Sequence, residues 1–229
     1  MSFSLSHVVP WGRSFDEYLR MFDLNADTLS GSILGCADGP AAFNAELTKR
    51  GGNVVSCDPL YAHSVQEISS RIDECFETVL AQTRLNADGF VWSSEIPDVD
   101  ALGTTRMAAM RAFLGDFVDG KLQGRYVTSE LPKLQFANDT FDLALCSHFL
   151  FLYEPLGLDF HVHSVVELCR VAREVRVFPL IQLDGQISPY LSVVIEKLTS
   201  LKCFTEIAPV PYEFQRGAGE MLRVSQATP

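Results

Sequence analysis

The residues with the clearest capacity for chemistry follow two short apolar runs near the start of the chain. Gly35, Ala37 and Gly39 alternate after the first run, and Asp58 ends the second. Glycine allows a ligand to approach the backbone closely, and a carboxylate can accept hydrogen bonds from both hydroxyls of a ribose. Together they predict a binding site for a nucleoside-containing cofactor. The alternative is a turn whose glycines serve only close packing.

The spacing of this turn indicates which cofactor is expected. It reads G-x-A-x-G, whereas a dinucleotide-binding turn reads G-x-G-x-x-G. It resembles motif I of the class I S-adenosylmethionine-dependent methyltransferases, D-x-G-x-G-x-G, with two departures. Ile33 stands where the family usually has an acid, which removes a polar anchor near the methionine end, and Ala37 replaces the middle glycine. The resemblance implies S-adenosylmethionine as cofactor, with contacts from Gly35, Cys36, Ala37, Gly39, Asp58, Pro59 and Leu60.

A second motif lies in the middle of the chain. The run from Leu134 to Leu143 reads LQFANDTFDL. It resembles the L-P-F-x-D-x-S-F-D-L run that precedes the fourth strand of many small-molecule methyltransferases, with Gln135 for the proline and Thr140 for the serine. With both motifs, the chain is identified as a member of this superfamily, in its type 11-like small-molecule branch.

The resemblance also implies roles for residues elsewhere. Arg13, in a helix expected over the cofactor site, would bind the cofactor's carboxylate, since a guanidinium pairs well with that group. Glu130, after the third strand, would bind the adenine amino group, with the backbone of Ser129 and Leu131 beside it. The alternatives are a surface arginine and an exposed loop glutamate.

Three candidate residues follow the expected fourth strand. Loops beyond the carboxyl ends of the central strands hold the ligand in a doubly wound sheet. We therefore expect Ser147 beside the cofactor, His148 as a candidate general base and Tyr153 as a residue that orients the substrate. A histidine that only satisfies backbone groups is the alternative for His148.

No metal site is predicted. His161 and His163 form H-x-H, but residues two apart on a helix point away from each other. The six cysteines include no C-x-x-C pair, so we expect buried free thiols, as in a reducing compartment.

Hydrophobic periodicity predicts the elements that position these residues. Strands are expected near 33–34, 54–55, 125–128, 141–145 and 175–180, with a late hairpin over 204–210 and 220–225. Helices are expected over 41–50, 64–83, 103–118, 160–172 and 188–200, and Ser14 with Glu17 forms a capping box that begins another.

This order predicts an α/β three-layer sandwich with a mostly parallel seven-stranded sheet and an antiparallel last strand. The connection over 63–123 is longer than usual between two strands. We interpret it as a helical insertion that forms a lid and substrate wall, or alternatively as an enlarged helical layer. One domain over 1–229 is expected, with an N-terminal helical arm over 1–31.

Composition narrows the class of partner. The formal net charge is −11, with 18 basic against 29 acidic residues, which disfavours binding to nucleic-acid phosphates. No basic leader and no apolar run of membrane-spanning length is seen, so we expect a cytoplasmic protein without a membrane partner.

The leading hypothesis is methyl transfer from S-adenosylmethionine to a small or medium acceptor. Alignment of the acceptor with the methyl group can supply most of the catalysis without an obligatory side-chain catalyst. One alternative is a non-catalytic S-adenosylmethionine-binding protein. Another is an NAD(P)-dependent oxidoreductase, but the turn spacing and the terminal hairpin argue against the oxidoreductase. The acceptor and the oligomeric state are not predicted.

Overall fold

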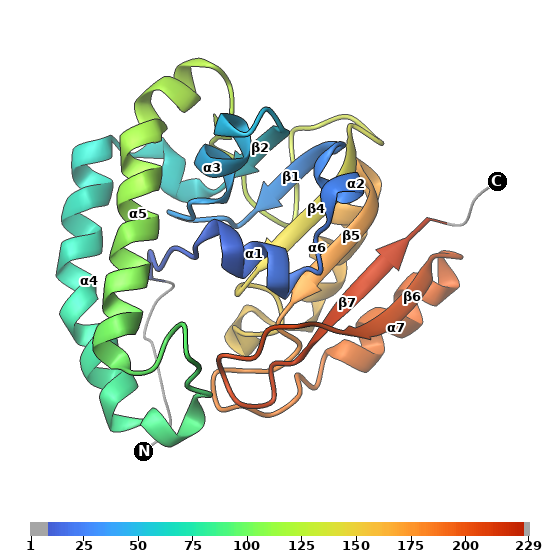
Figure 1. The fold of residues 1–229 in the computed structure, drawn as a ribbon. Coiled ribbons are helices and arrows are strands. Elements are labelled where there is room, and N and C mark those ends of the chain that lie inside the picture. The colour runs from blue at the N-terminus through green and yellow to red at the C-terminus, as the bar shows by residue number, and fades with distance from the viewer. Residues whose placement is uncertain (1–8, 227–229) are drawn as a thin grey trace.

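The computed structural model describes residues 9–226. Its centre is a seven-stranded sheet with the strand order β3-β2-β1-β4-β5-β7-β6 (Figure 1). Strands β1 to β5 pair in parallel, and β7 pairs antiparallel with both β5 and β6, so β7 alone of these seven strands runs in the opposite direction. The predicted fold class, including the antiparallel last strand, is confirmed. The strands are β1 (Ser32–Cys36), β2 (Asn53–Cys57), β3 (Tyr126–Val127), β4 (Phe141–Ser147), β5 (Ala172–Phe178), β6 (Phe204–Pro209) and β7 (Glu220–Ser225).

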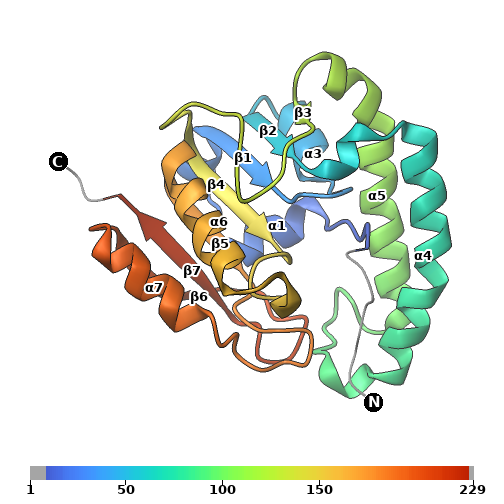
Figure 2. The ribbon, with the colours of Figure 1, turned by 180° about the vertical axis from the view of Figure 1, so that it is seen from behind.

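Helices cover both faces of this sheet. Figure 1 shows α1, α3 and α5 in front of it, and Figure 2, from behind, shows α6 and α7 on the opposite face. The helices are α1 (Phe15–Met21), α2 (Ala26–Leu29), α3 (Phe43–Lys49), α4 (Val65–Leu85), α5 (Val99–Leu122), α6 (Leu158–Val171) and α7 (Leu191–Ser200), with short 3-10 helices at Pro59–Ala62, Ala87–Gly89 and Glu154–Leu156.

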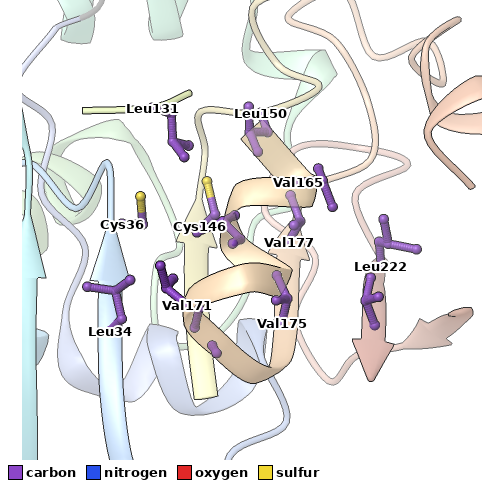
Figure 3. Packing of buried hydrophobic residues seen from close by; sticks show 14 of the residues in the cluster. Leu34, Cys36, Leu131, Cys146, Leu150, Val165, Val171, Val175, Val177 and Leu222 are labelled. Carbon is purple, nitrogen blue, oxygen red and sulfur yellow. The ribbon is translucent and has the colours of Figure 1, made fainter. Parts of the chain in front are cut away.

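The face covered by α6 and α7 holds the larger apolar core. Leu34 of β1 and Val177 of β5 pack there against Val165 and Val171 of α6 (Figure 3). Cys36 and Cys146 lie in the same core, below Leu131 and Leu150 in the view of Figure 3, with exposed fractions of 1% and 0%. The predicted burial of thiols is confirmed for four cysteines, whereas two others are partly exposed: the buried ones are Cys36, Cys57, Cys75 and Cys146, and the partly exposed ones are Cys169 and Cys203.

Local signals fix the ends of several helices. The Ser14–Glu17 capping box is present and begins α1, and a second box at Ser64 begins α4. The prediction for α5 was too short, because Asp98 caps it: its carboxylate accepts from the N–H of Ala101 at 2.8 Å. The prediction for α3 was too long at its start, since the helix begins at Phe43 after an uncapped turn.

The connection from β2 to β3 contains α4 and α5, so the two helices predicted within 63–123 are present. Their role as a lid and substrate wall stays a prediction. The tip of this insertion meets the loop between β6 and β7, where the rings of Phe90 and Phe214 stack with centroids 4.9 Å apart. The N–H of Val91 also donates to the carbonyl of Phe214 at 2.7 Å. The insertion is therefore tied to the far end of the chain. Among residues 9–226, no helix is long and apolar enough to cross a membrane.

Candidate active site

A cavity of about 390 Å³ opens at the carboxyl ends of the central strands. It is lined by the segments that follow β1, β2, β3 and β4, and by parts of the insertion and of the β6–β7 loop. This is the position at which doubly wound sheets bind ligands, and the volume lies in the usual range for small-molecule sites. Of the predicted site residues, those that line it are Arg13, Ala37, Gly39, Asp58, Pro59, Ser129, Glu130, Leu131, Ser147, His148 and Tyr153.

Three predicted residues do not line this cavity. Gly35 and Cys36 are part of β1, and the side chain of Cys36 packs in the core, so neither residue lines the cavity. Leu60 instead lines an adjoining cavity of about 740 Å³, which shares Gly39, Asp58 and Pro59 with the first. The expectation of direct contact is therefore corrected for Gly35 and Cys36, and Leu60 lies on the other side of Asp58.

The turn after β1 contains backbone conformations that residues with a side chain rarely adopt. Ala37 and Gly39 have φ values of 53° and 52°, in the left-handed region. A Cβ on Gly39 would meet nothing within 4 Å, so open space faces this residue. The N–H of Ala37 donates to the carbonyl of Cys57 at 2.9 Å, which ties the turn to β2.

Asp58 connects the turn to the end of β2. Its Oδ2 accepts from the N–H of Gly39 at 2.9 Å, and its Oδ1 accepts from the N–H of Leu60 at 2.8 Å. Burial raises the pKa of Asp58 to about 6; the two N–H donors lower it, and nearby Asp38 and Glu130 raise it further. The carboxylate faces the cavity without a cationic partner among the described residues.

Asp38 is a site residue that sequence reasoning missed. The residue is 6% exposed and lines the cavity, and its carboxyl accepts from the hydroxyls of Tyr18 at 2.5 Å and Ser56 at 2.6 Å. Burial raises its pKa, while the two hydroxyl donors oppose that shift. A Cβ on Gly35 would collide with this carboxyl, so Gly35 makes room for it. The available signal was an acid inside the turn itself, one residue before Gly39.

His148 lies at the end of β4 in a strained conformation. Its φ is 53°, and its N–H donates to the carbonyl of Phe178 at 2.7 Å. Its Nδ1 is 2.8 Å from the hydroxyl of Ser147, and the described residues offer no partner for Nε2. Burial, together with the charges of Arg13 and Arg106, lowers the pKa of His148 well below its ordinary value. The imidazole is therefore neutral at physiological pH, and in the tautomer whose Nδ1–H donates to Ser147 its Nε2 can accept a hydrogen bond.

The segment before α1 crosses over the turn. Gly12 packs so closely against Pro40 that a Cβ would collide with its carbonyl, and the N–H of Ala42 donates to the carbonyl of Arg13 at 3.0 Å. One terminal nitrogen of Arg13 donates to the carbonyl of Trp11 at 2.5 Å. Its Nε is buried without a partner, and burial, with the charge of Arg106, lowers its pKa to about 10. Such an unpaired buried donor favours an anionic ligand group beside it.

A buried ion cluster supports this segment from behind. Glu17 pairs with Arg106, and the hydroxyl of Tyr212 donates to Glu17 at 2.7 Å. The exposed fractions of the Glu17 and Arg106 side chains are 1% and 0%. The cluster joins α1, α5 and the segment after β6, three parts that frame the cavity. No pattern in the sequence identified Arg106, since its partner lies far away in the chain.

No metal site is found among residues 9–226, where no group of three or more suitable side chains gathers. His161 is buried, and its Nδ1 lies 2.7 Å from the carbonyl of Gly157 in the same helix.

Comparison with known proteins identifies a relative that matches nearly the whole chain. The chain is 33% identical over 221 residues to the uncharacterized protein MJ0045 of Methanocaldococcus jannaschii, with 96% of each chain covered. No protein-family model matches the chain, so the type 11-like branch stays a prediction.

Solved structures of S-adenosylmethionine-dependent methyltransferases are similar at low sequence identity. A putative enzyme of this class from Methanococcus maripaludis is 11% identical with a TM-score of 0.47, covering 93% of this chain and 84% of the other. One from Methanosarcina mazei is also 11% identical with a TM-score of 0.47, covering 88% and 94%.

Proposed function

We propose that this chain, which belongs to the same protein family as MJ0045 of Methanocaldococcus jannaschii, is an S-adenosylmethionine-dependent methyltransferase with a small or medium acceptor. The observation that carries the proposal is the hydrogen bond between the Gly39 N–H and the Asp58 carboxylate at the mouth of the cavity. It holds the backbone turn beside the acid that we propose to bind the ribose.

The charges of the cavity fit this cofactor. Asp38 and Asp58 face it without a cation among the described residues, and the Nε of Arg13 is buried there without a hydrogen-bond partner. S-adenosylmethionine carries an ammonium and a sulfonium as well as a carboxylate, so it would bring cations to the two acids and an acceptor to this donor. A nicotinamide dinucleotide would instead bring its diphosphate towards two carboxylates, which is electrostatically unfavourable.

The residues that would hold the cofactor follow from this fit. Asp58 would accept the ribose hydroxyls, and the loop from Ser129 to Leu131 would receive the adenine. Asp38 would face the ammonium, and Arg13 the carboxylate. The bound cofactor supplies an activated methyl group, and the chain's own part is to orient the acceptor, exclude water and accept a proton at His148 where the nucleophile carries one.

The proposal is tested by label transfer. The purified protein is incubated with S-adenosylmethionine labelled in its methyl group and with pools of small metabolites, and labelled products are separated and identified. Label in a product that is absent with Asp58→Asn supports the proposal. Cofactor binding without any product from broad pools would favour the non-catalytic binder.

A further inference from the structure

The acidic and the aromatic residues that line the cavity lie in different parts of its wall. All three acidic residues that line it, Asp38, Asp58 and Glu130, follow β1, β2 or β3. Among residues 9–226, the rest of the lining is mainly apolar and contains no carboxylate. Besides the buried Tyr18, six partly buried aromatic residues line the cavity: Trp11, Phe90, Phe149, Tyr153, Phe160 and Phe214.

These rings are held in place by one another. Phe149 meets Phe160 edge-on with centroids 5.9 Å apart, and it lies 6.2 Å from the ring of Tyr153. On the insertion side, Phe214 stacks on Phe90. Fixed rings lose little conformational freedom when a flat ligand enters, so they favour planar molecules over flexible ones.

Two further features of the cavity indicate which chemical group of the acceptor receives the methyl group. None of the described residues that line this part of the cavity is acidic, so an ammonium group would find no counter-ion among them. His148 lines the cavity with Nε2 free of any described protein partner, while its Nδ1 is engaged with Ser147. A neutral imidazole in this position suits a nucleophile that must lose a proton.

We infer that the acceptor is a flat aromatic molecule that carries a hydroxyl group, bound among these rings with its hydroxyl towards Nε2 of His148. The inference rests on the proposed function. In the transfer, the acceptor oxygen forms a bond to the methyl carbon as the bond from that carbon to sulfur breaks. The electron pair of the broken bond stays on sulfur, and the hydroxyl proton passes to Nε2 of His148.

Binding tests the inference without turnover. The full chain is first saturated with S-adenosylhomocysteine and then titrated by calorimetry with 2-naphthol, cyclohexanol, 2-naphthylamine and 2-naphthoate. We expect 2-naphthol to bind at least tenfold more tightly than cyclohexanol or 2-naphthoate. Equal affinity for cyclohexanol would overturn the planar aromatic class, and preference for the carboxylate or the amine would overturn the hydroxyl class. Failure of S-adenosylhomocysteine to bind would instead contradict the proposed function.

Matched variants locate the site. Phe149→Leu keeps apolar volume but removes one ring, and we expect about a tenfold loss of 2-naphthol affinity with S-adenosylhomocysteine affinity within twofold. Phe204→Leu changes a ring that is 63% exposed on β6, away from the cavity, and should leave both affinities unchanged. If both variants lose naphthol affinity equally, or neither does, the acceptor does not bind among the aromatic residues that line the cavity.

The role of His148 has its own readout. With 2-naphthol as acceptor, His148→Asn should keep naphthol affinity within threefold but lower turnover about a hundredfold near pH 7. The loss should shrink as pH rises towards the ionisation of the naphthol, because the acceptor then no longer needs a base. A uniform loss at every pH would contradict proton transfer to His148.

Discussion

The N–H of Gly39 and the carboxylate of Asp58 are joined by a 2.9 Å hydrogen bond that links the turn after β1 to the end of β2. The same carboxylate caps the following 3-10 helix through the N–H of Leu60. Asp58 is therefore oriented by backbone donors on both oxygens before any ligand arrives. Because orientation is fixed in advance, little entropy is lost when a ribose binds.

Replacing Asp58 by Asn should weaken S-adenosylhomocysteine binding roughly tenfold to hundredfold, since hydrogen bonds to a charged group are worth about 1.5–3 kcal/mol. Isothermal titration calorimetry measures this directly. Asp73→Asn, on the exposed side of α4, is the matched control and should bind like the parent protein. Equal affinities for the parent protein and Asp58→Asn would exclude Asp58 from the site.

The raised pKa of Asp58 predicts a pH dependence of binding. Its ionised form is the better acceptor for ribose hydroxyls, and its pKa in the free protein is about 6. Affinity for S-adenosylhomocysteine should be full above that pH and fall as pH decreases through 6, because a proton must then be displaced. The dependence should flatten in Asp58→Asn. An affinity that rises on acidification would contradict the assignment.

Replacing Asp38 should affect binding of the two nucleosides differently from replacing Asp58. If it faces the ammonium group, Asp38→Asn should lose affinity for S-adenosylhomocysteine about tenfold but keep its affinity for 5′-methylthioadenosine, which lacks the amino-acid tail. Asp58→Asn should lose affinity for both. Competition binding with the two nucleosides separates the roles, and an equal loss for both in Asp38→Asn would place Asp38 elsewhere.

The buried pair of Glu17 and Arg106 predicts a large effect on stability. Burial alone would raise the pKa of Glu17, but Arg106, Arg13 and Ser14 lower it to about 2. A depressed pKa contributes stability that is present above the unfolded pKa of about 4.5 and is lost as pH falls towards 2. Arg106→Met leaves the carboxylate buried without its cation, so the free energy of unfolding should fall by about 3–5 kcal/mol at pH 7.

Urea denaturation measures that loss. Arg84→Met breaks an ion pair with Asp100 whose side chains are 50% and 85% exposed, so it should cost less than about 1 kcal/mol. The deficit of Arg106→Met should also shrink at pH 4, where Glu17 takes up a proton in the variant. A deficit as small as that of Arg84→Met would mean that the buried pair contributes little.

Because Gly35 lies close to the Asp38 carboxyl, adding a methyl group at position 35 should change both stability and cofactor binding. Gly35→Ala should push the Asp38 carboxyl out of place, with a loss of about 1–3 kcal/mol in unfolding free energy and weaker binding of S-adenosylhomocysteine. Gly89→Ala, where a Cβ meets nothing within 4 Å, is the control for thermal unfolding. Wild-type stability and binding in Gly35→Ala would show that the turn adapts.

Much of the fold was predictable because its signals are local. The Ser14–Glu17 capping box, the apolar pairs of the strands and the late hairpin all depend on neighbours in sequence. The helix α5 was predicted to begin only at Gly103, whereas Asp98 caps it and Gly103 lies inside it, where the side chain of Leu80 approaches closely.

The site was predictable only in part. Asp58 could be found because the end of a parallel strand fixes where its side chain lies. Asp38 and Arg106 could not, since each depends on partners distant in the chain: Tyr18 and Ser56 for the first, and Glu17 for the second. The stacking of Phe90 on Phe214 depends likewise on how two loops meet.

Calorimetric titration of the full chain with S-adenosylhomocysteine and with NADH at pH 7.5 tests the central claim most directly. We predict one site for S-adenosylhomocysteine with a dissociation constant in the micromolar range or below, lost on Asp58→Asn, and no heat with NADH. Absence of binding to the sulfur nucleoside, or tighter binding of NADH, would contradict a methyltransferase site at this cavity.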